Sequence, residues 1–282
     1  MIKIISDSTC DLSKDLLEKY NITTFPLHIH LGEEQYSDGV DITPDEIFAW
    51  SDLNKATPKT STVSPFEAEE VLTKALEDAD EVICFTISSH MSSCGSVMFM
   101  AAAQMGVSDR VFVVDSLSLS TGIGLQIIEA ALMAQQGLSA SEIVENIKAI
   151  QPRVRASFVV DTLTYLHRGG RCSAVAALAG GTLKLHPYIG VEDGKMKPGK
   201  KYRGKMIKVV RDYVDDLKED LLKAKSDRVF ITHSGSDEEI LNLVKEALEE
   251  LNHFDEILTT RAGSVITSHC GPGTLGVLFI AE

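Results

Sequence analysis

The chain has 282 residues, 44% of them hydrophobic and 24% charged, which suits one large or two ordinary globular domains. Its 27 Lys and Arg residues against 41 Asp and Glu residues give a net charge of −14, which argues against nucleic acid or an anionic membrane surface as the main partner. No apolar run approaches the ~18 residues of a spanning helix, the N-terminus does not resemble a signal peptide, and the five cysteines form no C-x-x-C pair. We therefore expect a cytoplasmic protein without stable membrane insertion.

Residues 1–155 alternate between predicted strands and helices. Apolar runs predict buried strands at residues 2–5, 22–31, 82–87 and 111–114. Helical patterns are expected at residues 11–20, 64–76, 97–105, 118–136 and 139–150, and Thr43-Pro44-Asp45-Glu46 begins another helix. This order favours an α/β domain with a mostly parallel sheet and helices on both faces.

The pattern changes after Pro152, and we place a domain boundary near residue 155. Residues 186–191 and 196–202 predict an antiparallel hairpin around Glu192-Asp193-Gly194. Further strands are expected at residues 156–160, 228–232, 257–261 and 276–281, and helices at 206–225 and 237–251. Residues 156–282 are therefore predicted to form a second α/β domain, with a mixed or antiparallel sheet, packed closely on the first.

Four serines lie within residues 88–93, between the strand at 82–87 and the helix that follows. Free N–H groups at a helix start and hydroxyl groups at the carboxyl end of a strand can together bind an anion. One serine would be explained as a helix cap or turn residue. Four within six residues favour an anion site.

Three other motifs are interpreted as structural. Ser6-Asp7-Ser8-Thr9 lacks the second aspartate of an aspartyl-phosphate loop, so turn and cap residues are favoured over the alternative of a phosphate-facing role. Gly271–Gly276 spells G-x-G-x-x-G but precedes a predicted strand, whereas a dinucleotide fingerprint opens a helix. His28 and His30 share one face of a strand without an evident third ligand, so we interpret them as surface residues and expect no metal.

A serine hydrolase is the alternative that the residues leave open. Ser92, Asp115 and His269 follow the Ser…Asp…His order of the α/β-hydrolases. Order alone is weak support, because no serine lies in a G-x-S-x-G nucleophile elbow.

Two arginines, Arg168 and Arg171, flank the glycine pair Gly169-Gly170. Arginine is suited to bidentate contact with a carboxylate or a phosphate. Taken alone, this segment is interpreted by default as a surface turn with solvated charges.

Together these segments resemble the DegV family, the fatty-acid-binding proteins of bacteria, and the resemblance runs from the first strand to the last. Its landmarks occur in the expected order: Ser6–Leu12, Lys59–Ser64, Ile87–Ser93, Asp115-Ser116, Tyr165–Arg171 and Ser268–Gly273. The resemblance implies a long acyl chain in an apolar tunnel between the two domains. It also implies a carboxylate held by Thr60 and Ser92, with Arg171 and His269 at the tunnel mouth.

The resemblance further implies a lipid carrier without catalytic residues, metal or cofactor other than the bound fatty acid. Such proteins resemble the substrate-carrying subunit of fatty acid kinase, which presents the carboxylate to a separate ATP-binding subunit for acyl-phosphate formation. By this resemblance His269 is assigned to the ligand, and Arg171 to transfer or partner docking. The chain departs from the family pattern at Thr62-Val63, Ser93-Cys94 and Cys172. The first two departures fall in the carboxylate loops, where they affect head-group or chain preference.

Overall fold

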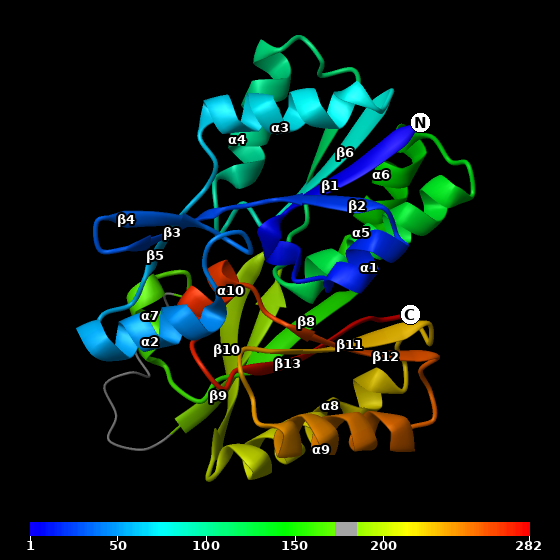
Figure 1. Cartoon of the computed structure of the whole chain (residues 1–282). Helices are drawn as coiled ribbons and strands as arrows, with labels where there is room; N and C mark the ends of the chain where they lie inside the picture. The colour runs from blue at the N-terminus through cyan, green and yellow to red at the C-terminus, as the bar shows by residue number, and fades with distance from the viewer. Residues whose placement is uncertain (173–184) are drawn as a thin grey trace.

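The computed structural model describes residues 1–172 and 185–282 and contains two large β-sheets and one small one, with helices around them (Figure 1). The first sheet has the strand order β2-β1-β6-β7, and all of its neighbouring strands are parallel. The second has the order β10-β9-β8-β13-β11-β12 and mixes directions. The predicted fold class, an α/β chain with one parallel and one mixed sheet, is therefore confirmed.

The parallel sheet is built from short apolar strands: β1 (Ile2–Asp7), β2 (Ile22–Phe25), β6 (Glu81–Thr86) and β7 (Val111–Asp115). Successive side chains of a strand point to opposite faces. Ile4 therefore packs with α5 and α6, whereas Ile5 packs with α3 and α4. The helices of this half are α1 (Lys14–Lys19), α2 (Pro44–Asn54), α3 (Pro65–Glu77), α4 (Cys94–Gln104), α5 (Thr121–Gln135) and α6 (Ala140–Ile150), with 3-10 turns at Ser8–Cys10 and Gln151–Arg153.

The mixed sheet contains β8 (Val154–Val159), β9 (Leu185–Glu192), β10 (Lys195–Arg203), β11 (Arg228–His233), β12 (Glu256–Arg261) and β13 (Leu275–Ile280). β9 and β10 form the predicted hairpin, and its turn residues Asp193 and Gly194 both have positive φ. The helices of this half are α7 (Thr164–Gly169), α8 (Met206–Leu221), α9 (Glu238–Glu250) and α10 (Ser264–Cys270). α8 and α9 cover one face of the sheet.

Helix α5 joins the two halves. Eleven consecutive residues, from Thr121 to Ala131, are buried. Its isoleucines share one apolar cluster with Phe85 of the first sheet and with Phe158 and Leu278 of the second. The two halves therefore share a core, as the prediction of close packing requires; the boundary near residue 155 stays a prediction.

One predicted strand is wrong. Residues 22–31 were expected to form a single strand but form β2 and β3 (His28–Leu31), which belong to different sheets. Pro26 separates them, because proline has no N–H to donate to a ladder. β3 pairs with β4 (Glu34–Ser37) and β5 (Lys59–Ser61) in the small sheet.

Helix α10 was not predicted. It is seven residues long, and it packs against α2, β3 and β5 of the first half although it lies near the other end of the sequence. Within the described ranges, no helix combines the length and apolar character that crossing a bilayer requires.

Candidate ligand-binding site

A cavity of about 270 Å³ lies between the halves, at the carboxyl ends of β6 and β11. In open α/β sheets, ligands bind at the carboxyl ends of the strands. Apolar side chains from both halves form most of the wall: Leu27, Ile87, Met91, Leu119, Phe158, Leu166, Met196, Val265, Ile266 and Leu278. A cavity of this composition suits an apolar ligand.

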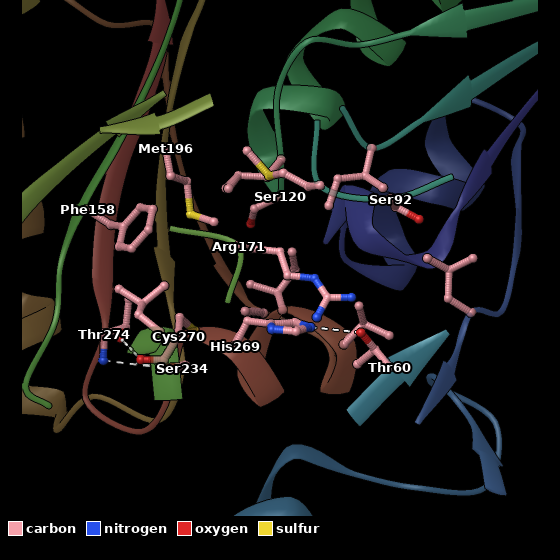
Figure 2. Close-up of a pocket in the computed structure, with 18 of the residues that line it drawn as sticks. Thr60, Ser92, Ser120, Phe158, Arg171, Met196, Ser234, His269, Cys270 and Thr274 are labelled. Carbon is pink, nitrogen blue, oxygen red and sulfur yellow. Dashed lines mark hydrogen bonds between the residues drawn. The ribbon is translucent and has the colours of Figure 1, made fainter. Parts of the chain in front are cut away.

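Thr60 and His269 meet at one side of the cavity. Thr60 is on β5 and His269 on α10, and the Thr60 Oγ1 atom lies 2.7 Å from His269 Nε2 (Figure 2). Both line the cavity. The structure therefore brings together two of the residues that the sequence assigned to the carboxylate, although they are 209 positions apart.

His269 is held neutral by its surroundings. Burial, and then the charge of Arg171, lower its pKa to about 4. Its Nδ1 atom is buried and has no hydrogen-bond partner among the described residues. That atom faces Gly169, where an added Cβ would lie 2.5 Å from it. A glycine is therefore required at position 169 for the imidazole to keep this place.

Of the four serines predicted to form an anion site, only Ser92 and Ser93 line the cavity. The Ser92 Oγ atom accepts a hydrogen bond from the Cys94 N–H at 3.2 Å, at the start of α4. Ser92 thus caps the start of α4, which is the role that a single serine would be expected to have. Its hydroxyl proton is still available to a ligand. Ser88 is buried and donates to the Gly194 carbonyl at 2.7 Å, and Ser89 is exposed.

Arg171 lies at the open side of the cavity. It lines the cavity but is itself exposed, and its Nη1 atom donates to the Gly169 carbonyl at 2.8 Å. Figure 2 shows its guanidinium between Ser92 on one side and the Thr60–His269 pair on the other. A fixed positive charge therefore faces the polar side of the cavity.

The residues of the hydrolase alternative do not form a triad. Asp115 Oδ1 accepts hydrogen bonds from Ser89 N and Leu117 N at 3.2 and 3.0 Å, and Asp115 does not line the cavity. His269 bonds Thr60 rather than Ser92, and no described carboxylate reaches its Nδ1 atom. The serine hydrolase reading has no support.

The two strand histidines have other contacts. His28 Nε2 lies 3.0 Å from Glu67 Oε1, and His30 Nε2 lies 2.8 Å from Ser61 Oγ. The surface interpretation is wrong for His28, which is only 6% exposed. Across residues 1–172 and 185–282, no group of three or more His, Cys, Asp or Glu side chains is arranged to hold a metal ion.

The remaining motifs are structural, as predicted. The Asp7 carboxylate caps the first 3-10 turn and accepts from Thr9 N at 3.0 Å and from Ile87 N at 2.8 Å. Gly271 and Gly273 have positive φ in the turn that leads into β13, a strand. This turn does not open a helix, so it is not a dinucleotide site.

Four hydroxyl groups in the cavity wall were missed by the sequence analysis. They belong to Ser120, Thr232, Ser234 and Thr274. Ser120 donates to Asp11 Oδ2 at 2.5 Å, Ser234 to the Gly271 carbonyl, and Thr274 to the Cys270 carbonyl at 2.9 Å. Thr232 and Thr121 share a bond of 2.6 Å. Their hydrogen bonds are made within the protein, so this wall can contact an apolar chain without leaving donors unpaired.

Comparison with known proteins identifies the family. The model for "Uncharacterised protein, DegV family" matches residues 1–282. A DegV domain-containing protein of Deinococcus radiodurans is 33% identical over 276 residues, which cover 98% of this chain and 97% of that protein. A fatty acid-binding protein of Thermotoga maritima is 30% identical, and the match covers 98% of this chain and 96% of that protein. The chain belongs to the DegV family.

Solved structures agree on the fold. A DegV family protein from Thermus thermophilus, described by its fatty acid binding, has a TM-score of 0.90 at 30% identity and covers 100% of this chain and 99% of its own. DegV of Bacillus subtilis, described as a fatty acid binding protein, has a TM-score of 0.86 at 27% identity, with the same coverage. A stearic acid-binding protein from Eubacterium ventriosum has a TM-score of 0.83 at 32% identity, with 100% and 98% covered.

Proposed function

We propose that this chain binds a long-chain fatty acid in the cavity and presents its carboxylate to a separate ATP-dependent kinase subunit. The observation that carries the proposal is the cavity itself, which is apolar along most of its wall and polar at the Thr60–His269 pair. The fatty acid binding described for the relatives supports the same ligand class.

The acyl chain supplies most of the affinity in this proposal. A saturated sixteen-carbon acid has about 14 methylenes, and at ~0.8 kcal/mol each their burial is worth roughly 11 kcal/mol before costs. Association and ordering remove a large share of that value. The polar residues then need only orient the head group and exclude ligands without a carboxylate.

Thr60 and Ser92 are the proposed direct ligands of the carboxylate, and His269 acts on the same group through its hydrogen bond with Thr60. A neutral imidazole carries one proton, and with that proton on Nε2 His269 donates to Thr60 Oγ1. The Thr60 hydroxyl is then free to donate to a carboxylate oxygen. The Ser92 hydroxyl can donate to the same group, because its oxygen is occupied as an acceptor by Cys94 N–H.

Arg171 is the proposed transfer or docking residue. Phosphoryl transfer to a carboxylate spreads negative charge over the moving oxygens, which an arginine can stabilise. Arg171 is exposed at the cavity opening, where a second protein can reach it. In this scheme the chain is a substrate carrier in the cytoplasm, and the kinase subunit performs the chemistry.

The test is to denature the purified protein, extract it with organic solvent and analyse the extract by mass spectrometry. A fatty acid at close to one equivalent is expected. An empty extract, together with no uptake of added fatty acid, refutes lipid binding. Hydrolysis of simple esters that is lost in Ser92→Ala would instead restore the hydrolase alternative.

A further inference from the structure

Helix α10 carries His269 but has no side-chain cap of its own. Its N-cap residue is Gly263, and a helix of seven residues is only marginally stable by itself. Two carboxyl groups from the first half of the chain take the place of the cap. Asp11 Oδ1 accepts a hydrogen bond from Gly263 N at 2.8 Å, and Asp38 Oδ1 accepts one from Ser264 N at 2.7 Å. The start of α10 is therefore fixed by residues that lie 252 and 226 positions earlier in the sequence.

Both carboxyl groups are buried, with exposed fractions of 6% for Asp11 and 4% for Asp38. Burial raises the pKa of each, to about 8 for Asp11. A serine or asparagine at position 263 would cap the helix without burying two acids, but that side chain would move with the helix. An added Cβ at Gly263 would also lie 3.2 Å from both Asp38 carboxyl oxygens and 3.3 Å from Asp11 Oδ1. The two acids instead fix the start of the helix relative to the first half.

The same contacts connect the cavity wall with the head-group site. Asp11 Oδ2 accepts a hydrogen bond at 2.5 Å from the hydroxyl of Ser120, which lines the cavity. At the other end of α10, His269 Nε2 lies 2.7 Å from Thr60 Oγ1 (Figure 2). Gly263 lies six residues before His269, or ~9 Å along the helix axis. A change in the direction of the helix at Gly263 therefore displaces the imidazole.

We propose that Asp11 and Asp38 are positioning residues, which hold α10 so that His269 stays bonded to Thr60. The inference rests on the proposed function, since it concerns recognition of a carboxylate. Neither acid touches the ligand in this scheme, because neither lines the cavity. Loss of either acid releases the start of α10, and the imidazole leaves its buried place. Affinity for a carboxylate then falls, while affinity for the acyl chain is kept.

The first measurement is the pKa of His269 in delipidated protein, by NMR of its ring proton, which is assigned by comparison with His269→Gln. The test variants are Asp38→Ala and Asp11→Gly, with glycine at position 11 because Asp11 has a positive φ. Release of the imidazole should move its pKa up from about 4 toward the ordinary 6.5. Loss of a nearby negative charge alone would lower this pKa, so the direction of the shift identifies displacement.

Three further variants separate positioning from general destabilisation. Asp38→Asn and Asp11→Asn should keep the wild-type pKa of His269, since an asparagine oxygen still accepts from the helix N–H. The matched control is Ser139→Ala, which removes the cap of α6, a helix that does not line the cavity, and it should also keep that pKa. An unchanged pKa of His269 in both test variants, or an equal change in the control, overturns the proposal.

The second measurement is titration with a fatty acid and with its methyl ester. Asp38→Ala and Asp11→Gly should bind the acid about tenfold more weakly and the ester within about twofold of the wild type. In a Thr60→Val background, Asp38→Ala should cause little further loss for the acid, because both changes act on one contact. Equal losses for acid and ester, or losses that add in the double variant, also overturn the proposal. If the wild type binds no fatty acid, the proposed function fails, whereas the pKa of His269 still decides whether the two acids position it.

Discussion

Replacing Thr60 with valine tests the proposed head-group site most directly. Valine keeps the shape of the side chain and removes the hydroxyl that lies 2.7 Å from His269 Nε2. A hydrogen bond to a charged group is worth about 1.5–3 kcal/mol, so Thr60→Val should weaken fatty acid binding about 12- to 160-fold. Isothermal titration with a fatty acid and with its methyl ester measures the effect, because the ester has the same chain without the charge.

The loss should be about tenfold larger for the acid than for the ester. Ser92→Ala should behave in the same way. Thr259→Val is the matched control, since Thr259 is an exposed threonine on β12, and it should bind both ligands like the wild type. Equal losses for acid and ester would refute carboxylate recognition and leave Thr60 as a residue that only supports the fold.

Three further results are expected. Arg171→Ala should keep most fatty acid affinity but lose acyl-phosphate formation with the kinase subunit and ATP, whereas Arg168→Ala should keep both; a parallel loss of binding and turnover in Arg171→Ala would contradict the division of roles. The pKa of His269 is lowered to about 4 in the native state, so between pH 6.5 and pH 4 this histidine is protonated mainly in the unfolded chain. The free energy of unfolding should therefore fall by about 2 kcal/mol between pH 8 and pH 5. Burial raises the pKa of Asp11 to about 8, which changes the free energy of unfolding with pH in the opposite direction. The contribution of His269 is therefore measured by comparing urea unfolding of the wild type and His269→Gln across this pH range. Identical pH profiles would show that His269 does not contribute. Gly169→Ala should displace the imidazole and reduce stability by about 1–3 kcal/mol, with weaker fatty acid binding; unchanged thermal unfolding would show that the loop accommodates the methyl group.

The features that the sequence predicted correctly depend on residues close together along the chain. Thr43, Ser64 and Ser139 each form a capping box with the glutamate three positions later. The β9–β10 hairpin follows from the turn at Asp193-Gly194, since both residues take the positive φ that such a turn requires. Local spacing is sufficient for these elements, and with them for the fold class.

The features that were missed depend on distant residues. Pro26 is a local signal for the break between β2 and β3, but the assignment of β3 to a separate sheet depends on its partners, β4 and β5. Helix α10 contains Ser264, Thr267 and Ser268, hydroxyl residues that also suit a turn, and it is stabilised as a helix by packing on the first half. The Ser120 hydroxyl in the cavity wall is held by Asp11, more than a hundred positions earlier. No local pattern predicts such contacts.

The late position of α10 and β13 in the sequence affects how the molecule folds. β13 lies between β8 and β11, so a chain that stopped before Ser264 would divide the second sheet into two separate pieces, β10-β9-β8 and β11-β12. The same truncation would remove the partner of Thr60. Completion of the sheet and formation of the proposed head-group site therefore both require the last segment of the chain, and pairing over such sequence separations is slow. Recovery of fatty acid binding during refolding should consequently follow the slowest step of sheet formation, with no ligand-competent intermediate before it.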